Sequence, residues 1–143
     1  MQTMLRTTRF GDIAIDEDRV FHFADGLPGF PGARSFLAMN VEGNDDLYWL
    51  QCLEDGALAF LAVSPWSYFP DYEPEVGEAD QQALGLDDPD DATVLCLLTV
   101  DRDAELITAN LLGPLVINTA RRVGRQVVLA DANWPLAARL GVL

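Results

Sequence analysis

The sequence predicts an all-β fold: a compact, β-barrel-like single domain with short capping helices, spanning residues 1–143. Segments of four to nine residues rich in Val, Ile, Leu, Phe, Tyr and Thr recur along the chain, and these residue types favour strands. Clusters of Gly, Pro, Asp and Asn separate the segments. Each strand with its turn takes about ten to twelve residues, which is typical of a sandwich or barrel. The length of 143 residues is that of one domain.

The expected strands follow from these apolar segments and from the turns between them. Phe10-Gly11-Asp12 and Glu54-Asp55-Gly56 have the composition of tight turns between neighbouring strands. Leu27-Pro28-Gly29-Phe30 suits a type II turn, because Pro presets φ and Gly accepts a positive φ. The segments LAFLAV and VLCLLTV are apolar on both faces, as expected for strands covered on two sides. Strands are expected at residues 3–10, 12–16, 19–23, 36–42, 47–53, 57–64, 93–101, 106–119 and 125–130.

Two short helices are expected beside these strands. The first covers residues 78–84, where acidic side chains favour the positive end of the helix dipole. Gly85 is suited to a left-handed stop, after which Leu86 folds back onto the last turn. The second covers residues 135–140 and is opened by a proline near its first position.

Charge is the unusual feature of the composition. The chain has 23 acidic residues and nine basic ones, all of them Arg, which gives a net charge of −14. A field of this sign repels nucleic-acid phosphates and anionic membrane surfaces and attracts basic partners. Neither direct nucleic-acid binding nor membrane binding is expected. The N-terminus lacks the apolar core of a signal peptide, and no uncharged run resembles a membrane span, so we expect a cytoplasmic protein.

The residues that most often carry chemistry are few. Cys52 and Cys96 lie in the apolar runs WLQCLE and TVLCLLTV, which favours buried free thiols and leaves a disulfide open until the geometry is known. His22 is the only histidine, and an isolated histidine on a strand is more often structural than a base or metal ligand.

Known catalytic motifs are missing from the sequence. The run LDDPDDA lacks the central Gly and terminal Glu of an EF-hand loop, so the acidic clusters are interpreted as solvated turns. The chain contains no Gly-x-Ser-x-Gly, Walker-type or dinucleotide-binding motif. We therefore expect no catalytic residue, metal or cofactor, and a protein that is not an enzyme.

Two segments stand out from an ordinary core. Residues 65–74 hold four aromatic side chains and three prolines before the sequence turns acidic, and aromatic side chains are enriched at protein interfaces. The alternative is a proline-stiffened crossover that caps the barrel. Residues 108–119 are apolar with Asn near both ends and a Gly-Pro break, which a bulged or bent strand explains.

Six motifs in collinear order resemble the family of the flagellar assembly factor FliW. The resemblance spans residues 8 to about 135, and the tail NWPLAARLGVL is less distinctive. Each motif is weak alone, but six in order are a strong signal. They are TRFG at 8–11, GLPGF at 26–30, YWLQ at 48–51, FPDYE at 69–73, TANLLGPLVINT at 108–119 and RQVVL at 125–129.

The resemblance implies a β-barrel-like protein without catalysis that serves flagellum biogenesis as a chaperone and translation regulator. Members bind flagellin and, once flagellin is exported, bind the RNA-binding regulator CsrA instead, which relieves repression of flagellin translation. The negative charge suits a basic partner, but it does not distinguish RNA mimicry from an allosteric effect. We predict as partner-binding residues Tyr68, Phe69, Asp71, Tyr72, Asn110 and Asn118, with Tyr72 as a surface anchor that contributes little to stability.

Two other functional classes remain open at this point. A small enzyme with an unrecognised carboxylate site would show a convergent cluster of buried acids with perturbed pKa values. An acidic RNA mimic would occupy the nucleic-acid site of a partner directly, through the partner residues that also bind RNA.

Overall fold

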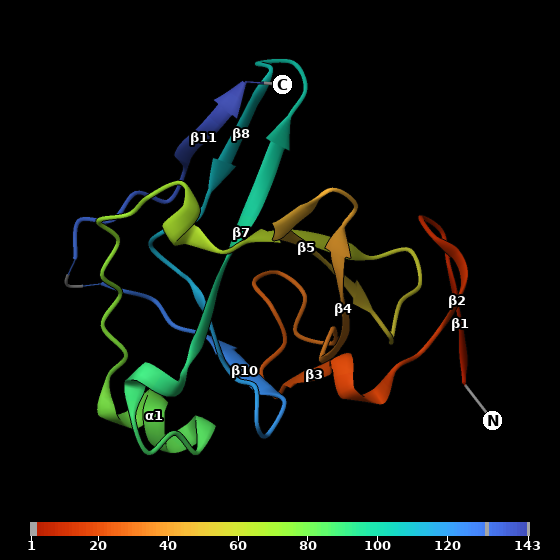
Figure 1. Cartoon of the computed structure of the whole chain (residues 1–143), viewed down its shortest axis with the longest axis horizontal. Coiled ribbons are helices and arrows are strands. Elements are labelled where there is room, and N and C mark those ends of the chain that lie inside the picture. Colours follow the sequence, from red (N-terminus) through yellow and green to blue (C-terminus); the bar gives the residue numbers. More distant parts are fainter. Residues whose placement is uncertain (1–2, 131, 143) are drawn as a thin grey trace.

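The computed structural model describes residues 3–130 and 132–142 and is dominated by strands (Figure 1). Within these residues, no helix is both long enough and apolar enough to cross a membrane. The strands are β1 Met4–Thr7, β2 Gly11–Ala14, β3 Val20–Phe23, β4 Ser35–Val41, β5 Asn44–Cys52, β6 Ala59–Val63, β7 Thr93–Asp101, β8 Leu106–Ala109, β9 Leu115–Asn118, β10 Val123–Gln126 and β11 Ala138–Val142. The helices are α1 Glu78–Leu84 and the 3-10 turns η1 Glu17–Arg19, η2 Pro65–Ser67 and η3 Pro89–Asp91.

In the described part of the chain, seven strands close into a barrel in the order β3, β4, β5, β6, β7, β9, β10. Neighbouring strands are antiparallel, apart from the parallel pair of β10 and β3 that completes the ring. The all-β, barrel-like prediction is confirmed.

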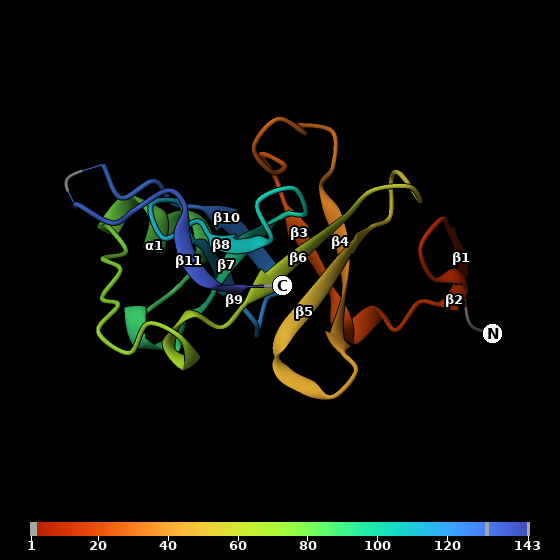
Figure 2. The ribbon, with the colours of Figure 1, turned by 90° about the horizontal axis from the view of Figure 1, so that it is seen from above.

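Two extensions leave the barrel. Residues 98–101 at the end of β7 pair with β8, and β8 pairs with β11, so that three strands form an arm beyond the ring (Figure 1). The hairpin of β1 and β2 lies on the side of the barrel away from α1 (Figures 1 and 2). Phe10 in its turn packs edge-on against Trp49, with the ring centroids 5.7 Å apart.

The first hydrophobic core fills the barrel. Alternation along each strand directs every second side chain inward, so Leu95 of β7 and Leu115 of β9 meet residues from β3, β4 and β5. The buried members are Phe23, Leu27, Ala33, Phe36, Ala38, Leu50, Cys52, Ala62, Leu95, Leu115 and Ile117.

A second core lies on the outer face of β7 and β9. Val94 and Cys96 of β7 and Val116 of β9 point away from the barrel interior and pack under the segments that cover this face. This two-sided burial confirms what the doubly apolar sequence of β7 predicts. The buried members are Val63, Tyr72, Leu84, Leu86, Val94, Cys96, Ala109, Leu111, Val116, Val127, Leu129 and Ala138.

The predicted helix at 78–84 is confirmed, together with its stop signal. Gly85 adopts a left-handed conformation with φ of 68°. The amide of Leu86 donates to the carbonyl of Gln81 at 2.8 Å, and the Leu86 side chain is buried in the second core. This is the hydrogen-bond pattern and apolar contact of a Schellman cap.

The predicted helix at 135–140 is wrong, because β11 occupies the second half of that range and residues 135–137 are not helical. β11 covers the outer edge of β8, with Ala138 paired to Ala109. Ala138 is buried, Arg139 is exposed and Leu140 is half-buried, which is the period-two pattern of a strand. Pairing with a distant strand outweighs the weak helix preference of so short a segment.

The predicted continuous strand at 106–119 is also wrong, because residues 110–114 form a turn between β8 and β9. The Asn110 side chain accepts a hydrogen bond from the Gly113 amide at 2.9 Å and so caps this turn. Pro114 has no amide hydrogen to continue a ladder. Other strand boundaries differ by a few residues, as at 125–130, where β10 ends at Gln126.

Both cysteines are free and buried, which confirms the interpretation from the sequence. Burial raises the pKa of the Cys96 thiol to about 12 and also raises the pKa of Cys52. Both thiols are therefore protonated at neutral pH, and they react slowly because the thiolate is the reactive form. Their burial also shields them from reagents.

We expect Tyr72 to stabilise the second core. Its ring is 2% exposed and its hydroxyl donates to the carbonyl of Leu111 at 2.7 Å. Tyr72→Phe should lower the free energy of unfolding by about 1–2 kcal/mol through the lost hydrogen bond. Tyr72→Ala should lower it by about 3–5 kcal/mol through the cavity. Urea denaturation measures both, with the exposed Tyr68→Phe as the control, and a Tyr72→Ala protein as stable as wild type would contradict the packing.

A second expectation concerns the thiols. In native buffer at pH 8, dithionitrobenzoate should label neither Cys52 nor Cys96 within minutes, because both are protonated and covered. In denaturing urea the same reagent should label two thiols per chain at once. Rapid labelling of the native protein would show that one of the two cores opens readily.

Candidate protein-binding surface

The aromatic segment 65–74 leaves the barrel at the end of β6 and crosses the second core. It begins with η2, whose Pro65 carbonyl accepts hydrogen bonds from the amides of Tyr68 and Phe69. The Tyr72 amide then donates to the Phe69 carbonyl at 3.0 Å. These turns fix the backbone, so that some aromatic side chains point into the core and others point outward.

Tyr72 points inward, and the expectation that it is a surface anchor is wrong. Its ring stacks edge-on against Trp134 at 4.8 Å, and its carbonyl accepts a hydrogen bond from the Trp66 indole nitrogen at 2.8 Å. Burial raises the pKa of its hydroxyl. The contact with Leu111 joins residues 39 positions apart, and nothing in the local sequence distinguishes an inward Tyr72 from an outward one.

The outward side chains are those of Trp66 and Tyr68. Trp66 is 45% exposed and Tyr68 is 40% exposed, while Phe69 is half-buried against the second core. We call Trp66, Tyr68 and Phe69 the aromatic surface. Sequence reasoning missed Trp66 as a site residue, although the segment containing it was identified.

An acidic groove borders the aromatic surface. It has a volume of about 330 Å³ between the segment that carries Trp66 and the turn η3. Glu73 and Asp90 line it together with apolar residues such as Val94. Asp71 is also exposed in this segment. A hollow lined by both apolar side chains and carboxylates suits a partner side chain that is apolar and flanked by positive charge.

The two predicted asparagines have structural contacts and lie apart in the fold. Asn110 caps the turn before β9, next to Leu111, and so belongs to the neighbourhood of Tyr72. Asn118 is 7% exposed. Its side-chain nitrogen donates to the Leu84 carbonyl at 2.9 Å, and its oxygen accepts from the Arg121 amide at 3.3 Å. Asn118 therefore contacts the end of α1, and the structure does not bring it to the aromatic segment.

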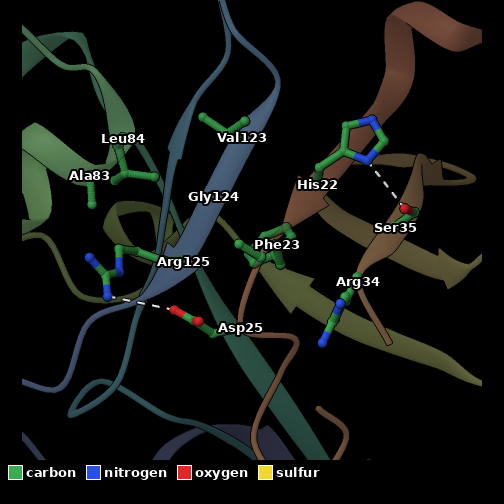
Figure 3. A pocket seen from close by; sticks show the side chains of 11 residues that line it. His22, Phe23, Asp25, Arg34, Ser35, Ala83, Leu84, Val123, Gly124 and Arg125 are labelled. Carbon is green, nitrogen blue, oxygen red and sulfur yellow. Dashed lines mark hydrogen bonds and ion pairs between the residues drawn. The ribbon is translucent and has the colours of Figure 1, made fainter. Parts of the chain in front are cut away.

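A second pocket, of about 420 Å³, lies at the seam where β3 meets β10 beside α1 (Figure 3). Phe23 and Gly124 pair across this seam. A side chain at position 124 would collide with the Phe23 ring, because an added Cβ would lie 2.7 Å from it. The need for glycine at 124 thus comes from packing within the barrel wall.

The polar side chains around this seam are largely paired with each other. Arg125 lies between Asp25 at 3.6 Å and Asp80 at 3.3 Å, so its charge is compensated on both sides. His22 is within 3.2 Å of the Ser35 hydroxyl (Figure 3). Across residues 3–130 and 132–142, no three His, Cys, Asp or Glu side chains are grouped to hold a metal ion. The pocket at the seam is lined by apolar residues and by charged side chains of both signs. Such a lining suits the binding of another molecule.

Comparison with known proteins gives a consistent result across the chain. The family model described as FliW protein matches residues 4–140. The flagellar assembly factor FliW of Moorella thermoacetica is 38% identical over 135 residues, covering 94% of this chain and 84% of that protein. The FliW of Alkaliphilus metalliredigens is 36% identical over 127 residues, covering 88% and 78%.

A solved structure supports the same assignment. The crystal structure of a flagellar assembly factor FliW superposes with a TM-score of 0.87 at 33% sequence identity, and the match covers 96% of both chains. The family model covers more than half of the chain, and both relatives exceed 30% identity over most of their own length. This chain therefore belongs to the FliW family of flagellar assembly factors.

Proposed function

We propose that this flagellar assembly factor works in the cytoplasm by binding flagellin and, when flagellin has been exported, the RNA-binding regulator CsrA. Binding of CsrA would relieve its repression of flagellin translation. The observation that carries the proposal is the aromatic surface, a set of partly exposed rings fixed on a well-packed core and bordered by carboxylates. Such surfaces supply the buried anchors and polar rims of protein interfaces.

The distribution of charge supports a basic partner. In the part of the chain that the structure describes, four ion pairs occur, and none of them includes Asp71, Glu73 or Glu75. The carboxylates beside the aromatic surface are therefore available to a partner. Together with the net charge of −14, they favour approach of a positively charged protein such as an RNA-binding regulator.

The rigidity of the platform also supports binding. The indole of Trp66 is tied to the Tyr72 carbonyl, and Tyr72 is fixed by Leu111 and Trp134. A side chain that is already ordered loses less conformational entropy when a partner covers it. Tyr72 thus contributes to binding by holding Trp66 in place.

The first test concerns the aromatic surface. Tyr68→Ala should weaken binding to flagellin, to CsrA or to both by about 1–3 kcal/mol, the range of a moderate interface anchor. Its melting temperature should change little, because Tyr68 is partly exposed. Calorimetric titration with each purified partner measures the affinities, and Met4→Ala, another exposed apolar residue on the distant hairpin, is the control. Wild-type protein that binds neither partner would refute the proposal, and unchanged affinities for Tyr68→Ala would exclude this surface.

The second test concerns electrostatic attraction. Stopped-flow association with CsrA should slow by about tenfold or more as ionic strength rises from low to physiological, because salt screens the attraction between exposed charges. Dissociation should change much less, since it depends on short-range contacts. An association rate that does not change with ionic strength would show that the acidic field does not contribute to recognition.

A further inference from the structure

A groove with a free strand edge lies between the start of α1 and the residues that follow β10. It has a volume of about 390 Å³, and its two walls are residues 127–130 with Ala132 and the segment that leads into α1. In both views the chain after β10 crosses close to the chain between η2 and α1 (Figures 1 and 2).

The first wall continues the ladder of β10 along one edge. The amides of Val127 and Leu129 donate to the carbonyls of Pro114 and Leu112 at 2.9 and 2.8 Å. Because backbone groups alternate between the two edges of a strand, the amide and carbonyl of Val128 face the opposite edge. β3 covers that edge only at Val123 and Gly124. Among the described residues, none is hydrogen-bonded to the Val128 backbone.

The second wall supplies charge and further free backbone. Glu73 and Glu75 line the groove and take part in none of the ion pairs of the described residues. Within the same residues, their backbone amides and carbonyls also have no hydrogen-bond partner. Asp80 lines the groove too, but Arg125 already neutralises it at 3.3 Å.

We propose that this groove binds an extended, basic segment of a partner protein, which adds a strand to the free edge at Val128 while its Lys or Arg side chains reach Glu73 and Glu75. Strand addition is a common mode of peptide recognition, in which backbone hydrogen bonds give affinity and side-chain sites give specificity. A second copy of this chain does not fit, since it would place the same carboxylates against each other. The inference rests on the proposed function and adds the kind of segment that is recognised.

The test uses a labelled six-residue peptide that alternates valine with arginine and has blocked ends. Fluorescence anisotropy should show saturable binding to the wild-type protein, and a valine–glutamate peptide should bind at least tenfold more weakly. Val128→Pro removes the amide hydrogen that faces the groove, at an edge where proline is tolerated. It should weaken binding at least tenfold, whereas the matched Val128→Thr, which keeps the amide, should stay within about twofold of wild type.

The charge requirement is tested with a matched pair of double variants. Glu73→Gln with Glu75→Gln should weaken the peptide about tenfold. Asp45→Asn with Asp103→Asn, on the β4–β5 and β7–β8 hairpins, removes the same charge and should have an effect of less than twofold. If Val128→Pro does not fold, hydrogen exchange of the Val128 amide in the wild-type protein tests the same contact. A bound peptide that pairs with Val128 must slow this exchange.

Any of four results would show that the groove is not a peptide-binding site. Two concern peptide affinity: no binding at millimolar concentration, or a folded Val128→Pro that binds normally. The other two are equal effects of the two double variants and unchanged hydrogen exchange of the Val128 amide when the peptide is added. Titration of the wild-type protein with flagellin and CsrA in parallel separates this inference from the proposed function. If the wild-type protein binds those proteins but not the peptide, only the proposal that the groove binds a basic segment is contradicted. Wild-type protein that binds neither protein overturns the proposed function.

Discussion

Burial of β7 on both faces is the constraint on which the rest of the structure depends. Leu95 belongs to the core inside the barrel, while Val94 and Cys96 belong to the core outside it. The barrel closes through the pairing of β7 with β9, and the arm begins where β7 pairs with β8. A single strand therefore joins the ring, the arm and the cover of the second core. The aromatic segment is ordered because the outer face of this strand needs an apolar cover in water.

Local sequence predicted the parts of this fold that depend on local chemistry. The doubly apolar VLCLLTV indicated a strand covered on two sides, and Gly85 indicated the end of α1. Both predictions are confirmed by the burial of β7 and by the left-handed Gly85. The strand at 138–142 and the break at 110–114 depend on pairing across the fold. Residues 135–140 have only a weak helix preference of their own, and the pairing with β8 makes residues 138–142 a strand.

The candidate site was predictable as a segment but not residue by residue. Four aromatic side chains in ten residues identified residues 65–74, and the structure divides them by burial. Tyr72 is 2% exposed and Tyr68 is 40% exposed, although both are tyrosines of the same ten-residue segment. The difference arises from Leu111 and Trp134, which come from later parts of the chain. The free edge at Val128 could not be predicted from the sequence for the same reason, because it depends on where the pairing of β3 with β10 ends.

The proposed partners would bind on the side of the molecule built over the second core. Hydrogen–deuterium exchange of the protein, alone and saturated with flagellin, is the decisive measurement. We expect slower exchange in residues 66–76 and 126–130, and unchanged exchange in β4 and β5 on the other side of the barrel. Protection confined to the β1–β2 hairpin and the outer face of β4 and β5 would contradict this expectation and place the binding surface on the opposite side.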